Sequence, residues 1–250
     1  MSNMEDMIAG KHAVLEAMRS GLTVNKIWIA QGSNPHQVQS VIEEAKASGV
    51  MYQFVDRRKL DQMVEKDVRH QGVIAQVAPH AYADIEDLFT AADKKGEAPF
   101  FIILDEIEDP HNLGSVLRTV ECVGAHGVII PKRRSVGITQ ATAKTSAGAA
   151  FYVPVARVSN LAQTLEILKQ RGVWIAGADA SAEQSVYDTD LTGPLAIVIG
   201  NEGRGLSRLI RERCDYLIKL PMRGRIQSLN ASVAAGVFLY EAVRQRSARG

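Results

Sequence analysis

The chain has 250 residues, of which 46% are hydrophobic and 23% charged, and its formal net charge is +1. That length fits one large domain or two modest ones, and the composition is ordinary for a soluble globular protein. No apolar run approaches the roughly 18 residues of a membrane helix, and the acidic N-terminus lacks a signal-peptide hydrophobic region. Cys122 and Cys214 have neither metal-ligand spacing nor a disulfide framework, so we interpret both as buried thiols and expect no bound metal. These features predict a cytoplasmic α/β protein.

Positive charge is concentrated in the C-terminal part of the chain. Residues 201–250 carry ten basic and four acidic side chains, whereas residues 79–98 carry two basic and five acidic ones. Lys132, Arg133, Arg134 and Lys144 form a second basic cluster in the sequence. Local basic patches on a nearly neutral protein indicate a polyanionic partner, and a solvated lysine and arginine face is the alternative.

The first 78 residues alternate between helical and strand periodicity, which predicts a small α/β domain. Residues 79–98 are acidic, bracketed by prolines and predicted as a linker with one helix over 84–92. In the first domain, His12, His36 and His70 are dispersed, and we interpret them as surface residues rather than ligands. We expect helices over 10–20, 36–47 and 60–64, and strands over 26–30, 51–55 and 72–78.

From residue 100 onward, strands and helices alternate regularly, which predicts a mainly parallel sheet in an α/β domain. The strands are apolar throughout, as strands covered on both faces should be. In such a sheet the loops that leave the carboxyl ends of the strands form the ligand crevice. We expect strands over 100–104, 127–130, 151–156, 173–178, 195–199 and 216–220, and helices over 113–123, 139–147, 159–171, 207–213 and 229–246.

The first loop of interest follows the strand at 100–104 and turns at Pro110. Asn112 stands where the next helix should begin, and asparagine is a preferred N-cap. Arg118 lies almost two turns into an otherwise apolar helix. A buried arginine is costly without an anion beside it, so we expect either an acidic side chain or a phosphate to meet Arg118.

Two further loops lie close together in the sequence. Residues 200–206, GNEGRGL, depart from the G-x-G-x-x-G spacing and no Walker lysine pattern occurs, so neither NAD nor ATP is supported. Glu202 is either a turn acid or faces a polar ligand. The second loop follows Pro221 and contains Ser228, which is well placed as an N-cap, and Asn230. Two loops of this kind suggest one small-molecule site between them, where apolar backbone beside a proline turn can hold a flat aromatic ring.

Three segments in order resemble the motifs of the SpoU (TrmH) branch of the SPOUT RNA methyltransferases. They are NLGSVLR at 112–118, IGNEGRGL at 199–206, and LPM at 220–222 followed by SLNASVA at 228–234. The segment GKHAVLEA at 10–17 further resembles the RNA-binding domain of bacterial 23S rRNA guanosine-2′-O-methyltransferases, the RlmB type.

The resemblance implies an L30e-like RNA-binding domain over residues 1–78, the linker over 79–98, and a methyltransferase domain over 99–250 with a C-terminal trefoil knot, an exception to the general absence of knots. It implies S-adenosylmethionine in the knot, contacted by Gly200, Leu220 and Leu229. It also implies a homodimer.

The implied reaction is methyl transfer to the ribose 2′-OH of a guanosine in the peptidyl-transferase region of 23S rRNA. The alternatives are a tRNA or another rRNA nucleotide, or a non-catalytic RNA-binding protein of ribosome assembly. By resemblance to the family, Arg118 itself could be the base. A guanidinium rarely gives up its proton, so a phosphate oxygen or water that accepts the proton while Arg118 positions it is physically easier. The implied catalytic residues are Asn112, Arg118, Glu202, Ser228 and Asn230, and the candidate phosphate contacts are Arg133, Arg134, Arg223 and Arg225.

Overall fold

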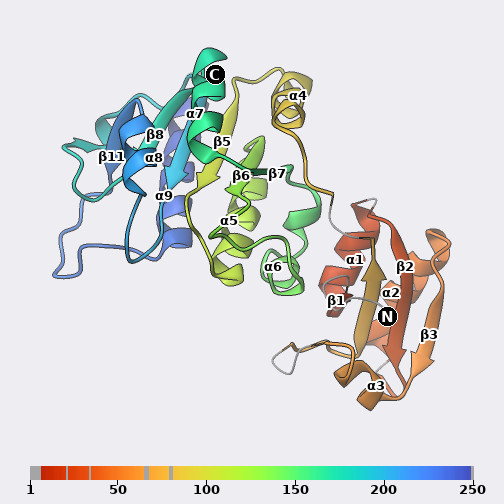
Figure 1. Ribbon diagram of the computed structural model, residues 1–250. Helices are drawn as coiled ribbons and strands as arrows, with labels where there is room; N and C mark the ends of the chain where they lie inside the picture. Colours follow the sequence, from red (N-terminus) through yellow and green to blue (C-terminus); the bar gives the residue numbers. More distant parts are fainter. Residues whose placement is uncertain (1–6, 21, 34, 65–67, 79–80, 249–250) are drawn as a thin grey trace. The chain divides into compact units, whose positions relative to one another are not determined.

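The computed structural model describes residues 7–20, 22–33, 35–64, 68–78 and 81–248 (Figure 1). The chain divides into two compact units. Residues 1–81 with 138–152 form the first, and residues 82–137 with 153–250 form the second. The segment 138–152 therefore groups with the N-terminal unit, although its sequence lies within the predicted C-terminal domain.

The first unit is built on a four-stranded sheet with the order β1-β4-β2-β3. β2 and β3 are parallel, and β4 is antiparallel to both β1 and β2. One core cluster packs Val14 and Val41 against the sheet, and another surrounds Trp28 and Leu60. The strands are β1 (Met7–Ala9), β2 (Val24–Ala30), β3 (Tyr52–Val55) and β4 (Val73–Val77), and the helices are α1 (Lys11–Arg19), α2 (Pro35–Ala47) and α3 (Arg57–Asp61).

Several local details of this unit differ from the prediction. β1 was missed because three residues are too short to show a period. α3 begins earlier than expected because the Asp56 side chain accepts a hydrogen bond from the backbone N–H of Arg58. His70 is buried rather than exposed: its Nδ1 accepts from the N–H of Gly72 at 3.0 Å and its Nε2 lies 2.9 Å from Oδ1 of Asp61. The side chain of His36 lies outside the described part of the structure.

The segment 138–152 joins the first unit through its own packing. It contains α6 (Gln140–Thr145) and a 3-10 turn, η2 (Ala149–Phe151). Phe151 packs against the core cluster of that unit, and the hydroxyl of Tyr152 donates to Glu16 Oε2 at 2.8 Å. Because residues 149–151 form this turn, the strand expected over 151–156 begins only at Val155.

The second unit contains a seven-stranded sheet with the order β7-β6-β5-β10-β8-β11-β9, in which every neighbouring pair is parallel. The predicted α/β class with a parallel sheet is confirmed. The strands are β5 (Phe100–Leu104), β6 (Gly127–Pro131), β7 (Val155–Val158), β8 (Trp174–Ala178), β9 (Gln184–Ser185), β10 (Leu195–Ile199) and β11 (Tyr216–Lys219).

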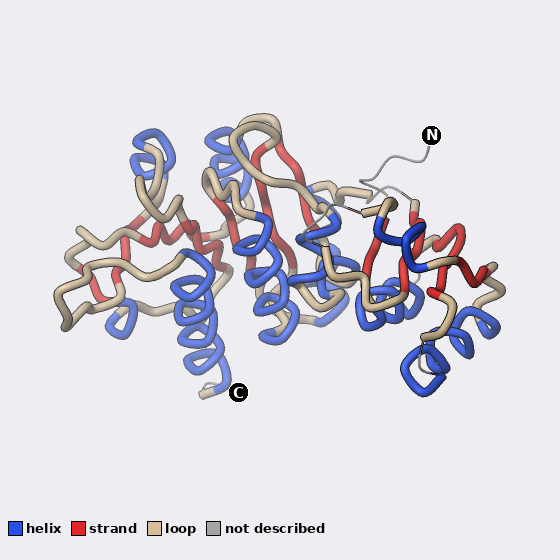
Figure 2. The backbone as a smooth tube through the Cα atoms, turned by 90° about the horizontal axis from the view of Figure 1, so that it is seen from below, coloured by secondary structure: helices blue, strands red, loops and turns tan. Residues whose placement is uncertain are grey.

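Helices cover both faces of this sheet (Figure 2). On one face Leu88, Leu165 and Ile210 pack over the strands, and on the other α5 and α9 lie side by side. The strands are continuous apolar runs because helices cover both faces of the sheet, as expected from the sequence. The elements are α4 (Ile85–Lys95), α5 (Pro110–Val123), α7 (Leu161–Gln170), η3 (Val186–Asp188), α8 (Arg208–Arg213) and α9 (Ala231–Ser247).

The strand order decides which loops meet. β10 lies between β5 and β8, and β11 lies beyond β8, so the segments that follow β5, β8, β10 and β11 all leave one edge of the sheet. After β11 the chain runs through 220–230 and returns in α9 beside α5. The trefoil knot expected in this part of the chain stays a prediction.

Two other expectations change in the second unit. The helix expected in the linker is α4, whose Leu88 and Phe89 are buried in the core of this unit. Cys122 is exposed and Cys214 only partly buried, so the expectation of two buried thiols is wrong. Burial of the Cys214 thiol nevertheless raises its pKa to about 12. No helix among the described residues is both long and apolar enough to span a bilayer.

Candidate active site

A cleft opens at the carboxyl ends of β8, β10 and β11, with a cavity volume of about 130 Å³. Residues 178–180, 199–205 and 219–229 contribute to its walls, and the first turns of α9 complete it with Phe238. Gly200, Leu220 and Leu229, the three cofactor contacts expected from the sequence, all line this cleft. The structure therefore brings the two loops together around one cavity.

The loop 200–206 is closed on itself in a way that requires glycine. Asn201 and Gly205 exchange two backbone hydrogen bonds, of 3.0 and 2.8 Å, and Gly205 has a φ of +68°. A Cβ placed on Gly200 would lie 2.3 Å from the carbonyl carbon of Gly205. The backbone of Gly205 occupies the space that any side chain at position 200 would need.

Two acidic residues that follow β5 hold this loop in place, and sequence reasoning missed both. Asp105 is buried, and its Oδ2 accepts from the N–H of Ser207 at 2.7 Å. Burial raises the pKa of Asp105, because the charged carboxylate loses hydration. The carbonyl of Glu106 accepts from Asn201 Nδ2 at 3.1 Å. The signal that could have identified them in the sequence is an acidic residue directly after a buried parallel strand.

Asn112, Glu202 and Asn230 form a hydrogen-bonded network that joins the three motifs. Nδ2 of Asn112 donates to Oε1 of Glu202, and Nδ2 of Asn230 donates to Oδ1 of Asn112 at 3.0 Å. Asn112 is 7% exposed, whereas Glu202 is exposed and belongs to the lining of the cleft. Both ends of the Asn112 amide are engaged, so its orientation is fixed.

The helix caps differ from those expected, and the difference frees Asn112 for the network. Asp109 caps α5, its Oδ1 accepting from the N–H of His111 at 2.8 Å, and Pro110 is the first helical residue. Asn230, not Ser228, caps α9. The predictions of Asn112 and Ser228 as N-caps are therefore wrong, and Ser228 is an exposed residue of the cleft lining.

Arg118 is exposed, so the expectation of a buried arginine is wrong. Six residues at about 100° each separate it from Asn112 on α5, which turns it toward a different side of the helix. Among the described residues it makes no hydrogen bond and no ion pair. An acidic partner within that part of the chain is thus ruled out, and the phosphate remains a prediction.

The four arginines expected to contact phosphate are all exposed. Nη1 of Arg134 lies 3.0 Å from Glu106 Oε1, and Nη2 of Arg204 lies 3.1 Å from the other oxygen of the same carboxylate. Within the described ranges, Arg133, Arg223 and Arg225 form no ion pair. Three of the four cations are therefore free of protein partners there. The described residues also contain no group of three His, Cys, Asp or Glu side chains that could hold a metal ion.

Comparison with protein-family models gives two matches that together span most of the chain. Residues 99–240 match the SpoU rRNA Methylase family, and residues 7–83 match a family described as RNA 2′-O ribose methyltransferase substrate binding.

Among curated proteins, the chain is 54% identical over its full length to YacO of Bacillus subtilis (strain 168), whose name assigns it provisionally to the TrmH family of tRNA/rRNA methyltransferases. It is 49% identical to a protein of Staphylococcus haemolyticus (strain JCSC1435) with the same provisional family name, over 97% of each chain.

Among solved structures, the SpoU methyltransferase AviRb from Streptomyces viridochromogenes in complex with AdoMet superposes with a TM-score of 0.82 at 27% identity. That match covers 96% of this chain and 90% of AviRb.

Proposed function

The chain belongs to the SpoU rRNA Methylase family, and on that premise we propose that it transfers a methyl group from S-adenosylmethionine to a ribose 2′-OH of RNA. The observation that carries the proposal is the cleft at the carboxyl ends of β8, β10 and β11, with the network of Asn112, Glu202 and Asn230 at its side.

The cleft would hold the adenosine part of the cofactor. Its walls include the apolar side chains of Leu220, Met222, Leu229 and Phe238, and the backbone of Gly200 belongs to the same lining. Backbone groups of the segments 200–205 and 220–229, which line the cleft, would recognise the ring edges. We assign Gly200, Leu220 and Leu229 to cofactor binding. When bound, S-adenosylmethionine supplies an electrophilic methyl group on a sulfonium centre.

The polar network would position the reacting groups rather than react itself. A ribose hydroxyl is a poor nucleophile at neutral pH, so alignment and proton removal must lower the barrier. Asn112 is fixed at both ends of its amide, and it ties the motif at the start of α5 to the loops that line the cleft. Glu202, Ser228 and Asn230 would complete the polar side of the pocket.

Arg118 would hold the phosphate next to the target ribose. Its exposure and its lack of a protein partner among the described residues leave the guanidinium available to an RNA oxygen. A guanidinium keeps its proton at neutral pH, so we assign the proton to a phosphate oxygen or a water that Arg118 positions. Arg133, Arg223 and Arg225 would contact further phosphates, and Arg134 could do so after release from Glu106.

We further propose that the RNA is 23S rRNA, with a guanosine of the peptidyl-transferase region as the target, and that the protein acts in the cytoplasm as an enzyme of the RlmB type. Support comes from the first unit, because residues 7–83 match the substrate-binding family and the segment 10–17 resembles the domain of that type. The alternative substrate is a tRNA, since the names of the relatives include both classes of RNA.

A homodimer is also part of the proposal. A shallow apolar surface on α9 includes Val233, Val237 and Tyr240, with Tyr187 beside it. Val233 and Tyr240 are 51% and 56% exposed, which is costly for large apolar groups in water. A second copy of the chain would cover this surface, and sedimentation of the intact protein tests the assignment.

The decisive experiment offers labelled S-adenosylmethionine with unmodified 23S rRNA or with a tRNA pool. We expect label at one ribose of 23S rRNA. Label in tRNA alone would keep the reaction and overturn the 23S assignment. If folded, cofactor-binding protein labels neither RNA nor immature ribosomal particles, the proposed catalysis is refuted in favour of an RNA-binding assembly protein.

A variant pair tests the role of Arg118. Arg118→Ala should abolish transfer and leave cofactor affinity within about twofold, because the side chain lies outside the cleft lining. Arg208→Ala, a change at another exposed arginine, on α8, is the control and should transfer at the wild-type rate. A wild-type rate for Arg118→Ala would remove this residue from the mechanism.

A further inference from the structure

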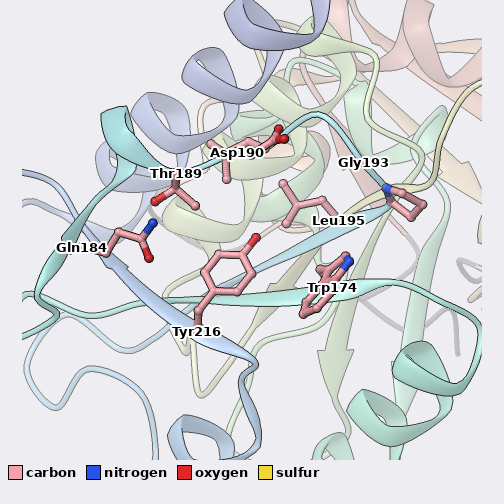
Figure 3. A pocket seen from close by; sticks show the side chains of 9 residues that line it. Trp174, Gln184, Thr189, Asp190, Gly193, Leu195 and Tyr216 are labelled. Atoms are coloured by element: carbon pink, nitrogen blue, oxygen red, sulfur yellow. The ribbon is translucent and has the colours of Figure 1, made fainter.

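A second pocket, of about 400 Å³, lies in the second unit at the start of the strands whose ends form the cofactor cleft. Trp174, Leu195 and Tyr216, the first residues of β8, β10 and β11, line it. Gln184 and the segment 189–194 complete the wall (Figure 3). Four residues along β8 separate Trp174 from the cofactor cleft at Ala178, a distance of about 13 Å at about 3.3 Å per residue.

Two aromatic rings form an open corner in this pocket. The ring centroids of Trp174 and Tyr216 are 6.4 Å apart and the ring planes meet at 47°. Trp174 is 59% exposed, although tryptophan gains much from burial. In Figure 3 the Tyr216 hydroxyl points into the space below Asp190, with the Trp174 ring on the neighbouring side. Two tilted faces with a carboxylate above them can enclose a flat group.

The wall opposite the rings is held in place by the end of α9. Gln245 accepts from the N–H of Leu191 at 2.9 Å and donates to the carbonyl of Thr189 at 3.0 Å. Arg246 donates to the carbonyl of Gly193 at 2.6 Å. The N–H and hydroxyl of Thr192 both donate to Oδ1 of Asp190 and so orient its carboxylate. The pocket is therefore formed before any ligand arrives.

The lining of this pocket carries one charged residue, the acidic Asp190. None of the nine residues that line it is a lysine, arginine or histidine. The nearest cation on α9, Arg246, stands behind the wall and donates to the carbonyls of Ala98, Leu191 and Gly193. Burial, followed by the charges of Asp215 and Asp190, raises the pKa of Tyr216 to about 12. This surface would repel an RNA phosphate and attract a cation.

We propose that this pocket binds an arginine side chain of a basic polypeptide partner, with the guanidinium stacked on the exposed Trp174 ring beside Tyr216 and paired with Asp190. A guanidinium is flat, weakly hydrated and permanently charged, so it stacks on aromatic faces better than an ammonium does. The distance from the cofactor cleft lets both sites be occupied together. The inference stands apart from the methyl transfer reaction and can be tested without it.

The test titrates the full-length chain with a short peptide that contains one central arginine, and with the same peptide carrying citrulline, which keeps the shape and removes the charge. Tryptophan fluorescence reports on the pocket, because Trp174 is exposed and the other tryptophan, Trp28, is buried. We expect the arginine peptide to bind at least about tenfold more tightly than the citrulline peptide. A third peptide, with lysine in place of the arginine, should bind with an affinity between those two.

Two variants and one control locate the binding. Trp174→Ala and Asp190→Asn should each weaken binding of the arginine peptide by about fivefold to tenfold. Binding to Trp174→Ala is measured by calorimetry, because that variant lacks the fluorescent ring. Asn keeps the acceptor that orients the turn, so Asp190→Asn should fold normally. Asp188→Asn removes an equal charge two residues away, outside the pocket lining, and should bind as the wild type does. None of these changes should alter methyl transfer to protein-free RNA.

Four results would overturn the inference. They are equal binding of the citrulline peptide, unchanged binding by Asp190→Asn, tighter binding of spermidine than of the arginine peptide, and quenching of Trp174 by a short single-stranded RNA that displaces the peptide. The last result would make the pocket a base-stacking site.

Discussion

Replacing Gly200 with alanine tests the link between the shape of the loop 200–206 and cofactor binding. The added Cβ would lie 2.3 Å from the carbonyl carbon of Gly205, 2.4 Å from its oxygen and 2.4 Å from the N of Leu206. All three are backbone atoms, so rotation of a side chain cannot relieve the overlap. The two halves of the loop must separate, and the pair of backbone hydrogen bonds between Asn201 and Gly205 must lengthen or break.

Overpacking of this kind typically costs about 1–3 kcal/mol of unfolding free energy. For a unit of this size each kcal/mol lowers Tm by roughly 2–4 °C. Because the same loop lines the cofactor cleft, we expect Gly200→Ala to weaken the binding of S-adenosylmethionine by about tenfold or more. The affinity is measured by calorimetry at a temperature where the variant is folded.

Gly203→Ala is the matched control within the same loop. A Cβ there would meet only Oδ1 of Asn201, at 3.6 Å, which is an ordinary contact. It should melt and bind cofactor as the wild type does. If Gly200→Ala binds cofactor normally, or if the control is impaired equally, close packing of the loop is not what shapes the cleft.

Three further predictions follow from the same contacts. Asn230→Asp keeps the cap of α9 but puts a carboxylate in place of the amide that donates to Asn112. Tm should therefore stay within about 2 °C of the wild type, while turnover should fall at least about tenfold. Turnover equal to that of the wild type would refute a role for the network. Trypsin should cut after Arg223 and Arg225, which lie in an exposed segment beside the cleft. Saturating S-adenosylmethionine should slow both cuts. An unchanged cleavage rate would show that the segment does not close on the cofactor. Burial raises the pKa of Asp105, so its contribution to stability is greatest below its unfolded pKa and is lost as pH rises through the folded value. Asp105→Asn should therefore gain stability relative to the wild type as pH rises above about 4, the usual pKa of an aspartate in an unfolded chain, in denaturant titrations, and a pH-independent difference would contradict this.

Much of the second unit follows from short-range patterns in the sequence. Continuous apolar runs such as 100–104 and 195–199 match β5 and β10 residue for residue, because a parallel strand covered on both faces leaves no polar position. The rule that ligands bind at the carboxyl ends of such strands indicated the two loops. The resemblance to the SpoU motifs singled out Gly200, Leu220 and Leu229 within them, and all three line the cleft.

Errors arose where one residue could play two roles. Asn112 and Ser228 both suit an N-cap, but capping depends on the local backbone, and Asp109 and Asn230 hold those positions. Arg118 was expected to be buried because its helix is otherwise apolar, yet burial on a helix depends on which sides its neighbours cover.

The sequence by itself determined the longer strands, the loops and the residue types of the site, because each depends on neighbours within a few positions. Only the tertiary structure decided which of these residues meet. Asn112 lies 90 positions from Glu202 and 118 from Asn230, and these pairs form because the strand order places β5 beside β10 and returns α9 to α5. Asp105 became an anchor of the loop after β10 by the same route. Periodicity along a chain carries no information about the order of strands across a sheet, and that order brings the three motifs into one site.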